Sequence, residues 1–378
     1  MKNKEISDVA GKFMLNGKLE RSTPYGSGHI NETFLLICSN GEKKNRYILR
    51  KINGYVFKRP EIVVENTRLI VGHIQRKLEE TGNANLIERT ASLIKTVDGN
   101  YFFRDGNRGV WCVMPFCERT YTIDFVKNEE DAYQAAKAFG RFQRLIADAD
   151  YKQFEPTIPD FHNTMKRFEY LLTVIEKNPA ERNSTSGKEI AFALENEHLP
   201  LKIRKLLEDK TIPFRLTHND TKINNVLFDA VTHQAVCVID LDTVMPGTVL
   251  YDFGDMVRTS TCAAAEDETD LSKVTMDINI FASLVKGYLE ELNEVLTKNE
   301  IENLVYGAEL IIYEQAIRFL TDYLEGDPYY KTKYPEHNLD RAKNQFALLK
   351  SVQKQKTDME RIVNEISLRG GTNAVSRN

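Results

Sequence analysis

Three polar residues stand at characteristic spacings in the second half of the chain. Residues 217–225 read T-H-N-D-T-K-I-N-N, which is the pattern H-x-D-x-x-x-x-N, and the apolar run 235–239 that follows ends at Asp240. Phosphoryl transfer needs a carboxylate that orients and deprotonates the attacking hydroxyl. It also needs an amide oxygen and a second carboxylate that hold Mg²⁺ against the phosphates. The pattern predicts Asp220 as the base and Asn225 and Asp240 as Mg²⁺ ligands.

Each member of the pattern also has a purely structural interpretation. An Asp in Asn-Asp-Thr can cap a helix, and an Asn before the apolar run Val226-Leu227-Phe228 can close a turn. The joint spacing of Asp220, Asn225 and Asp240 favours the catalytic interpretation. Asn224 competes with Asn225 as the metal ligand, and the five-residue spacing from Asp220 favours Asn225. His218 is expected to be structural, with hydrogen bonds to the backbone.

Two further acidic residues follow Asp240. Asp242 lies two positions on and shares a face with Asp240 if the strand continues, so it is a second metal contact, a substrate contact or a turn residue before Met-Pro-Gly. The string Asp252-Phe253-Gly254 resembles the D-F-G of protein kinases, but it lies too far beyond the catalytic stretch to supply the metal ligand. Asp252 is expected to brace the catalytic loop through backbone N–H groups.

Near the N-terminus, Gly26-Ser27-Gly28 forms a turn between two strand-like segments. Glycine lets backbone N–H groups approach a phosphate closely, so this turn is a candidate for nucleotide binding. Many hairpins carry G-x-G, and Asn31 stands where the third glycine of G-x-G-x-x-G would be. The chain has no G-x-x-x-x-G-K-[ST] string, which excludes a P-loop enzyme.

The third strand-like segment offers a cation for the α- and β-phosphates. Arg50 and Lys51 point to opposite faces of that strand, and alignment on the V-A-I-K pattern selects Arg50. Its expected partner is a carboxylate of the following helix, Glu65 rather than Glu61, although either can be a solvated surface charge. The next strand, 110–116, is expected to end in a hinge that places Met114 and Phe116 near adenine.

The order of segments predicts an α+β chain with two lobes. A short helix over 8–15, strands over 19–24, 33–38 and 47–52, a helix from Pro60 and strands near 91–96 and 110–116 form a nucleotide-binding lobe, residues 1–115. Helices over 130–150, 163–177, 188–195, 199–208, 275–298, 301–325 and 339–366 form a catalytic and substrate lobe, residues 116–368. Residues 369–378 are expected to be a mobile tail.

Composition limits the partners. The net charge of the 378 residues is −4, which points to neither nucleic acid nor an anionic membrane as a partner. The five cysteines are scattered without a C-x-x-C pair, so a disulfide framework or zinc site is not expected. No segment reaches the ~18 apolar residues of a membrane span. We expect a cytoplasmic protein.

Together these residues resemble the aminoglycoside phosphotransferase and choline kinase superfamily, over roughly residues 19–350. The strings at 26–33, 158–162, 240–247 and 335–342 are most similar to the N-acetylhexosamine 1-kinase branch. The resemblance implies a protein-kinase-like fold with a small antiparallel-sheet lobe and a mostly helical lobe. It also implies ATP- and Mg²⁺-dependent phosphorylation of the anomeric hydroxyl of GlcNAc or GalNAc.

The resemblance implies sugar contacts from the helical lobe. The candidates are Asp242, Arg258, Arg318, Asp322 and Tyr323. Arg318 and Asp322 share a helix face at i, i+4, where a surface ion pair is an equally good interpretation. The acceptor can instead be an aminoglycoside, choline or another amino alcohol, or methylthioribose. A non-catalytic nucleotide-binding regulator is a further alternative, which the intact Asp220, Asn225 and Asp240 disfavour. A hydrolase is disfavoured because the chain lacks a G-x-S-x-G string.

Overall fold

The computed structural model describes residues 3–26, 30–82, 90–106 and 109–375. The chain divides into two compact units, which are described separately. Unit 1 comprises Met1–Tyr121, Asp148–Pro159 and Leu227–Pro246, and unit 2 comprises Thr122–Ala147, Asp160–Val226 and Gly247–Asn378. This division differs from a single boundary after residue 115, because two later segments join unit 1. One of these segments carries Asp240 and Asp242.

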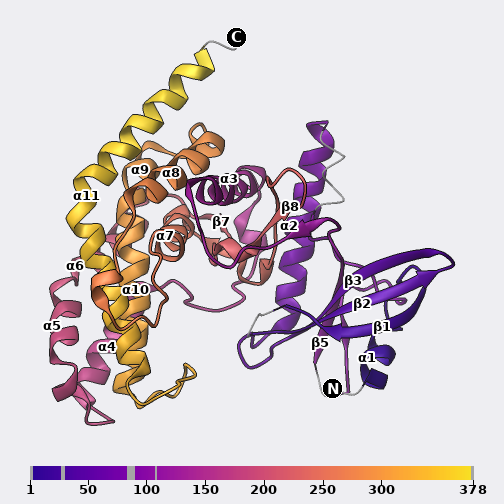
Figure 1. Cartoon of the computed structure of the whole chain (residues 1–378), viewed down its shortest axis with the longest axis horizontal. Helices are drawn as coiled ribbons and strands as arrows, with labels where there is room; N and C mark the ends of the chain where they lie inside the picture. The colour runs from indigo at the N-terminus through magenta and orange to yellow at the C-terminus, as the bar shows by residue number, and fades with distance from the viewer. Residues whose placement is uncertain (1–2, 27–29, 83–89, 107–108, 376–378) are drawn as a thin grey trace. The chain divides into compact units, whose positions relative to one another are not determined.

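Unit 1 is built on a five-stranded antiparallel sheet with the order β1-β2-β3-β5-β4 (Figure 1). The strands are β1 (Lys18–Pro24), β2 (Glu32–Asn40), β3 (Lys43–Ile52), β4 (Phe103–Arg104) and β5 (Val110–Pro115). Along β2 and β3 alternate side chains such as Leu36, Cys38 and Leu49 are buried, as the period of a half-buried strand requires. They pack with α1 (Asn3–Ala10) in one core cluster.

The helix of unit 1 packs with a second cluster. Helix α2 (Pro60–Glu80) has proline in its first turn, as expected, and its Val63 and Val64 lie in this cluster with Ile52 and Val110. The expected strand at 91–96 is wrong. Only Thr96 makes an isolated bridge, with Phe13, and β4 takes the edge of the sheet. A separate three-stranded sheet joins β6 (Thr120–Tyr121), β8 (Val226–Asp229) and β9 (Ala235–Val238).

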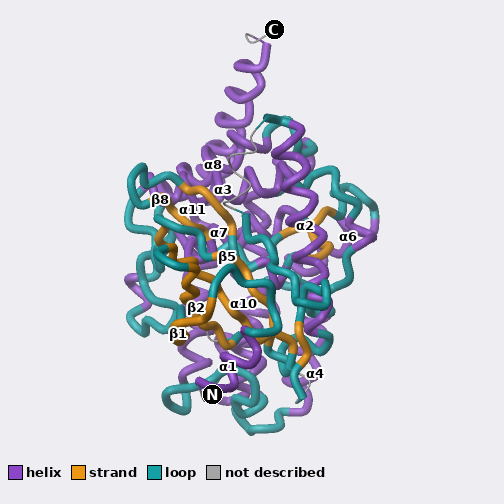
Figure 2. Tube along the Cα trace, turned by 90° about the vertical axis from the view of Figure 1, so that its right-hand side faces the viewer, coloured by secondary structure: helices purple, strands orange, loops and turns teal. Residues whose placement is uncertain are grey.

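Unit 2 is mostly helical (Figures 1 and 2). Its helices are α3 (Glu129–Leu145), α4 (Thr164–Lys177), α5 (Gly187–Glu195), α6 (His198–Glu208), α7 (Val249–Ser260), α8 (Ile278–Leu292), α9 (Lys298–Glu302), α10 (Leu304–Leu324) and α11 (His337–Val375). Two short strands, β7 (Arg215–Thr217) and β10 (Met245–Gly247), lie between α6 and α7 in the sequence. The expected class, a small antiparallel sheet followed by a mostly helical region, is confirmed.

Helix α10 forms the centre of unit 2. Nineteen of its twenty-one residues are buried, and only Gln315 and Arg318 are partly exposed. It approaches α7 closely at two glycines. A Cβ on Gly254 would lie 2.2 Å from the carbonyl oxygen of Gly307. The D-F-G string therefore lies inside helix α7, where its glycine permits helix packing.

Two features at the C-terminal end differ from expectation. Helix α7 was not anticipated, and α11 continues to Val375 instead of ending near residue 366. The helix thus includes residues 369–375 of the segment that was expected to be a mobile tail, and residues 376–378 lie outside the described residues. The far part of α11 extends beyond the other helices of unit 2 in both views (Figures 1 and 2). None of the described helices is long and apolar enough to cross a membrane.

Candidate active site

The catalytic loop of unit 2, residues 218–222, is held by the first turn of α7. Both oxygens of the Asp252 carboxylate accept backbone N–H groups, from His218 at 2.9 Å and from Asn219 at 2.7 Å. Asn219 adopts a left-handed conformation with φ 64°. Burial raises the pKa of Asp252, while His218 and these N–H groups act in the opposite direction. The predicted bracing role of Asp252 is confirmed.

His218 is fully buried beneath this loop. Its ring meets Phe139 and Phe142 of α3 edge-on, and its Nδ1 accepts the N–H of Asp220 at 3.3 Å. An aromatic cage and a backbone hydrogen bond fix the ring in place. The expected structural role of His218 agrees with these contacts.

The Asp220 carboxylate stands on this loop with a quarter of its side chain exposed. Lys222 Nζ lies 3.0 Å from Asp220 Oδ1, and Asn225 Nδ2 donates to Asp220 Oδ2 at 3.1 Å and to its carbonyl oxygen at 2.8 Å. Burial lowers the pKa of Lys222, but Asp220 and Asp255 outweigh this effect and raise it. The H-x-D-x-x-x-x-N pattern assigns no role to Lys222.

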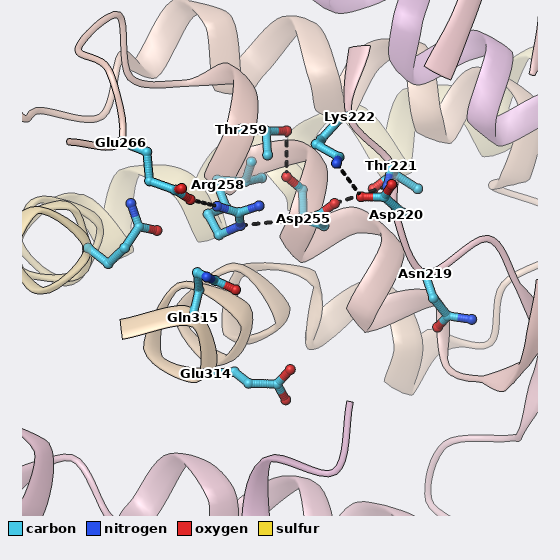
Figure 3. Close-up of polar contacts among 12 residues, drawn as sticks. Asn219, Asp220, Thr221, Lys222, Asp255, Arg258, Thr259, Glu266, Glu314 and Gln315 are labelled. Atoms are coloured by element: carbon cyan, nitrogen blue, oxygen red, sulfur yellow. Dashed lines mark hydrogen bonds and ion pairs between the residues drawn. The ribbon is translucent and has the colours of Figure 1, made fainter. Parts of the chain in front are cut away.

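A second carboxylate of α7 supports the end of the loop (Figure 3). Asp255 Oδ2 accepts the N–H of Thr221 at 3.0 Å, and its Oδ1 accepts Nε of Arg258 at 3.0 Å. Arg258 also donates to Glu266 at 2.8 Å. Burial lowers the pKa of Arg258, but the two carboxylates raise it by more. Arg258 is thereby held between two anions, one of which supports the catalytic loop.

Helix α10 is linked to the same loop through His162. Glu314 of α10 lies 2.9 Å from His162 Nδ1, and the other ring nitrogen, Nε2, lies 3.1 Å from the carbonyl oxygen of Asn219. Glu314 also accepts from Thr164 at 2.5 Å and lies 3.6 Å from Arg167 Nε. Burial raises the pKa of Glu314, yet His162, Arg167 and Arg318 outweigh it and hold the pKa at about 2.

Three of the predicted sugar contacts come from α10, and their side chains have different hydrogen-bond partners. Arg318 belongs to the partly exposed pair and donates to Gln315 at 3.0 Å. Asp322 instead accepts the backbone N–H groups of Tyr329 and Tyr330 and the amide of Asn338. The buried Tyr323 bonds Thr185 through its hydroxyl. Asp322 and Tyr323 thus hold loops of unit 2, and the role of these three residues at a substrate stays a prediction.

In unit 1, Arg50 extends from the middle of the sheet to two carboxylates. Its guanidinium makes a two-pronged contact with Asp242, Nη1 to Oδ1 at 3.0 Å and Nη2 to Oδ2 at 2.8 Å, and Nη2 also donates to Asp240 at 2.8 Å. The neighbouring Lys51 lies 3.5 Å from Asp105 and 5.1 Å from the ring of Trp111. The two cations are therefore engaged separately, and only Arg50 contacts the candidate metal ligand.

The pair Arg50–Asp242 is almost enclosed, whereas Asp240 is not. The side chains of Arg50 and Asp242 are 12% and 8% exposed, while that of Asp240 is 41% exposed and its backbone is left-handed, φ 60°. Burial raises the pKa of Asp242 to about 6, opposed by Arg50. For Arg50, burial lowers the pKa, but Asp242 and Asp240 together raise it well above its usual value.

The expected partnership between Arg50 and Glu65 is wrong. Glu65 is exposed and pairs with Arg68 three residues along α2, whereas Arg50 pairs with Asp242 and Asp240. Helix α2 instead supplies Asn66, whose Nδ2 donates to the carbonyl oxygen of Val244 at 3.0 Å. The helix thus holds the Asp242 segment through a neutral amide.

The remaining nucleotide-binding candidates of unit 1 lie at the ends of β1 and β5. Gly26 has a positive φ of 81°, as a turn after β1 requires, whereas Ser27 and Gly28 lie outside the described residues. Met114 is half-buried near the end of β5. Phe116 meets Tyr25 edge-on with ring centroids 5.8 Å apart and carries Arg46 over its face. Gly26 and Phe116 are thus brought to one end of the sheet.

Comparison with known proteins gives the family. The family described as "Phosphotransferase enzyme family" matches residues 22–278, which is more than half of the chain. Three solved structures share the fold. An aminoglycoside phosphotransferase from Alicyclobacillus acidocaldarius has TM-score 0.58 and 15% identity, with 95% of this chain and 96% of that one covered. A choline kinase from Cryptosporidium parvum has TM-score 0.58 and 15% identity, with 97% and 100% covered.

The third structure is a spectinomycin phosphotransferase in complex with ADP and spectinomycin. It has TM-score 0.53 and 16% identity, with 98% of this chain and 99% of that one covered. Identities this low establish the common fold, whereas the sequence match over 22–278 establishes the family. The chain therefore belongs to the phosphotransferase enzyme family.

Proposed function

We propose that this phosphotransferase transfers the γ-phosphoryl group of ATP, with Mg²⁺, to the anomeric hydroxyl of N-acetylhexosamines, GlcNAc or GalNAc. The main support is the setting of Asp220. Its carboxylate is partly exposed, lies beside the Lys222 ammonium and accepts a hydrogen bond from Asn225. A carboxylate held in this way can accept a hydrogen bond from an acceptor hydroxyl and take its proton.

The transfer balances without a further reactant. The acceptor oxygen forms a bond to the γ-phosphorus as the bond from that phosphorus to the bridging oxygen breaks, and ADP leaves. The hydroxyl proton passes to Asp220. Asp252 and Asp255 accept the backbone N–H groups of His218, Asn219 and Thr221 in the catalytic loop. The loop is therefore held in place, and Asp220 needs little reorganisation during the reaction.

Mg²⁺ fits the donor chemistry of the two proposed ligands. Both hydrogen bonds of the Asn225 amide use Nδ2, so within the part of the chain that the structure describes its oxygen has no hydrogen-bond donor. Asp240 supplies a partly exposed carboxylate. Oxygen donors of this kind suit Mg²⁺ bound jointly with phosphates. When bound, the ion neutralises charge on the phosphates. Gly26, Ser27, Gly28, Met114 and Phe116 remain proposed nucleotide contacts.

The acceptor proposal is supported by Gln315 and Arg318. They are the two residues of α10 that are not buried, and the helix is tied to the catalytic loop through Glu314 and His162. An amide and a guanidinium offer several hydrogen bonds to a polyhydroxylated sugar. The rings of Phe161 and Tyr330, which could face a quaternary ammonium group, lie 6.0 and 5.8 Å from the Arg318 guanidinium, so a cation already occupies their faces. We therefore propose that the sugar lies against Gln315, Arg318 and Arg258, the last of which belongs to α7 and lies near Gln315 (Figure 3).

The test is an ADP-release assay with GlcNAc, GalNAc, choline, an aminoglycoside and methylthioribose, followed by phosphorus NMR of the product. We expect turnover with an N-acetylhexosamine and a phosphate on the anomeric oxygen. A 6-phosphate, or turnover of choline alone, would refute the sugar 1-kinase assignment and leave the family. An enzyme that binds nucleotide but turns over no acceptor would favour the regulator. Asp220→Asn serves as the matched inactive control.

A further inference from the structure

The partner of Arg50 is a buried carboxylate of the segment after β9. Arg50 is fixed in a central strand, because its backbone faces Thr33 of β2 on one side and Cys112 of β5 on the other. From there the guanidinium meets Asp242 through two parallel N–H···O contacts. This two-pronged geometry fixes the plane and direction of the guanidinium as well as its charge. Asp240 contributes a single contact to the same group.

A third residue fixes Asp242. Asn31 Nδ2 donates to Asp242 Oδ2 at 2.6 Å, and Asn31 Oδ1 accepts the N–H of Asn53 at 2.9 Å. Asn31 precedes β2 and Asn53 follows β3, so one amide ties both ends of this hairpin pair to the carboxylate. The oxygens of Asp242 thus accept two N–H groups from Arg50 and one from Asn31. That occupancy argues against Asp242 as a substrate contact, the role expected from the sequence.

We infer that Asp242, held by Asn31, is the residue that positions Arg50 for the nucleotide phosphates. Arg50 has five N–H donors. Three make the contacts to Asp242 and Asp240, and the described residues offer no partner for Nε–H and the second N–H of Nη1. Those two donors remain for phosphate oxygens. The inference rests on the proposed function, because it takes ATP as the ligand.

Asp242 and Asp240 have different proposed roles. Asp242 is enclosed and held by a second side chain, so its contact to Arg50 persists when a ligand binds. Asp240 is 41% exposed and holds Arg50 by one hydrogen bond, so it can exchange Arg50 for a cation. Asp242 acts through Arg50 and is therefore a positioning residue, whereas the proposed role of Asp240 is direct.

The test measures nucleotide binding directly, without an acceptor. Calorimetry compares ADP with adenosine for the wild type and for Asp242→Asn, each with Mg²⁺ and with EDTA. We expect Asp242→Asn to weaken ADP binding about 10- to 100-fold, the effect of losing a hydrogen bond between charged groups. Adenosine binding should be unchanged, because adenosine has no phosphate. The loss should persist in EDTA, whereas any loss in Asp240→Asn should disappear there.

Further variants separate positioning from general damage. Arg50→Gln should show the same selective loss, and the double variant Arg50→Gln/Asp242→Asn should be no weaker than Arg50→Gln alone. Asn31→Ala removes only the support of Asp242 and should give a smaller loss for ADP. Asp105→Asn is the matched control, since Asp105 pairs with Lys51 on β3. Melting temperatures confirm that each variant is folded.

The outcomes distinguish this inference from the proposed function. Equal losses for ADP and adenosine in a folded Asp242→Asn, additive losses in the double variant, or a selective loss in Glu65→Gln instead would overturn the positioning role. In those cases ADP binding by the wild type still supports a nucleotide-dependent enzyme. A wild type that binds neither ATP nor ADP would overturn the proposed function, and the positioning role with it.

Discussion

The buried Glu314 should make the stability of unit 2 depend on pH. Its pKa is about 2 in the folded protein, against 4.5 for an unperturbed Glu, because His162, Arg167 and Arg318 outweigh the effect of burial. A carboxylate with a lowered folded pKa adds stability above its unfolded pKa and loses it as the pH falls towards the folded value. The difference of pKa corresponds to about 3 kcal/mol at neutral pH.

The linkage relation gives the course of this loss. Of the about 3 kcal/mol, about 1 kcal/mol is lost by about pH 4 and about 2 kcal/mol by about pH 3. Replacement by Gln keeps the shape but removes the charge. We therefore expect Glu314→Gln to lower the free energy of unfolding at neutral pH by a few kcal/mol, as loss of one member of a buried ion pair does. The deficit relative to the wild type should shrink as the pH falls.

Urea unfolding followed by far-UV circular dichroism is the appropriate assay, because unit 2 holds most of the helix. Fluorescence is less suitable, since the single tryptophan, Trp111, lies in unit 1. Glu360→Gln makes the same chemical change at an exposed position of α11 and should alter stability little. If the wild-type and Glu314→Gln curves stayed parallel between about pH 7 and about pH 3, the assignment of a depressed Glu314 pKa would be refuted.

Three further outcomes are expected. Asp220→Asn should lower kcat by about 10²- to 10⁴-fold with little change in ATP affinity, and steady-state kinetics would expose an error if kcat stayed at the wild-type level. Asp240→Asn should abolish turnover while the melting temperature is retained, so an active variant would remove Asp240 from the metal site. Arg318→Gln and Gln315→Ala should raise KM for the sugar without changing KM for ATP, and equal effects on both substrates would contradict their place at the acceptor.

Local sequence patterns predicted much of the fold. The helices α2, α4 and α6 and the strands β2 and β3 follow from their apolar periods and turn residues. The failures have physical causes. Residues 91–96 have strand-like composition but form no strand. Ile94 N–H donates a single backbone hydrogen bond to the carbonyl oxygen of Val113 in β5, while β4 pairs with β5 at Val110 and Trp111. Pairing depends on residues distant in sequence. Helix α7, which contains the string Asp252-Phe253-Gly254, was missed.

Only those residues of the candidate site that belong to a sequence motif could be predicted. Spacing indicated Asp220, Asn225 and Asp240, and the brace at Asp252 followed from analogy with catalytic loops. The partner of Arg50 could not be found this way, because Asp242 lies 192 residues further along the chain. His162 belongs to the string at 158–162. Its contacts to Glu314 and to the catalytic loop could not be predicted, because they join three segments that are distant in sequence. Asn31, which stands in the place of the third glycine of G-x-G-x-x-G, was a local sequence signal for the side chain that holds Asp242.

Helix α7 explains why the catalytic loop can be both exposed and fixed. Asp252 and Asp255 are three residues apart, so they lie on one face of the helix, and between them they accept the N–H groups of His218, Asn219 and Thr221. Asp220 is the one residue in this stretch whose N–H goes to a side chain of the loop itself, His218. The backbone on either side of Asp220 is therefore held by two anions of one helix, while its carboxylate stays partly exposed. Helix α7 thus makes the backbone of the loop rigid, while the position of Asp220 on the loop leaves its carboxylate accessible to a substrate. A general base requires both properties.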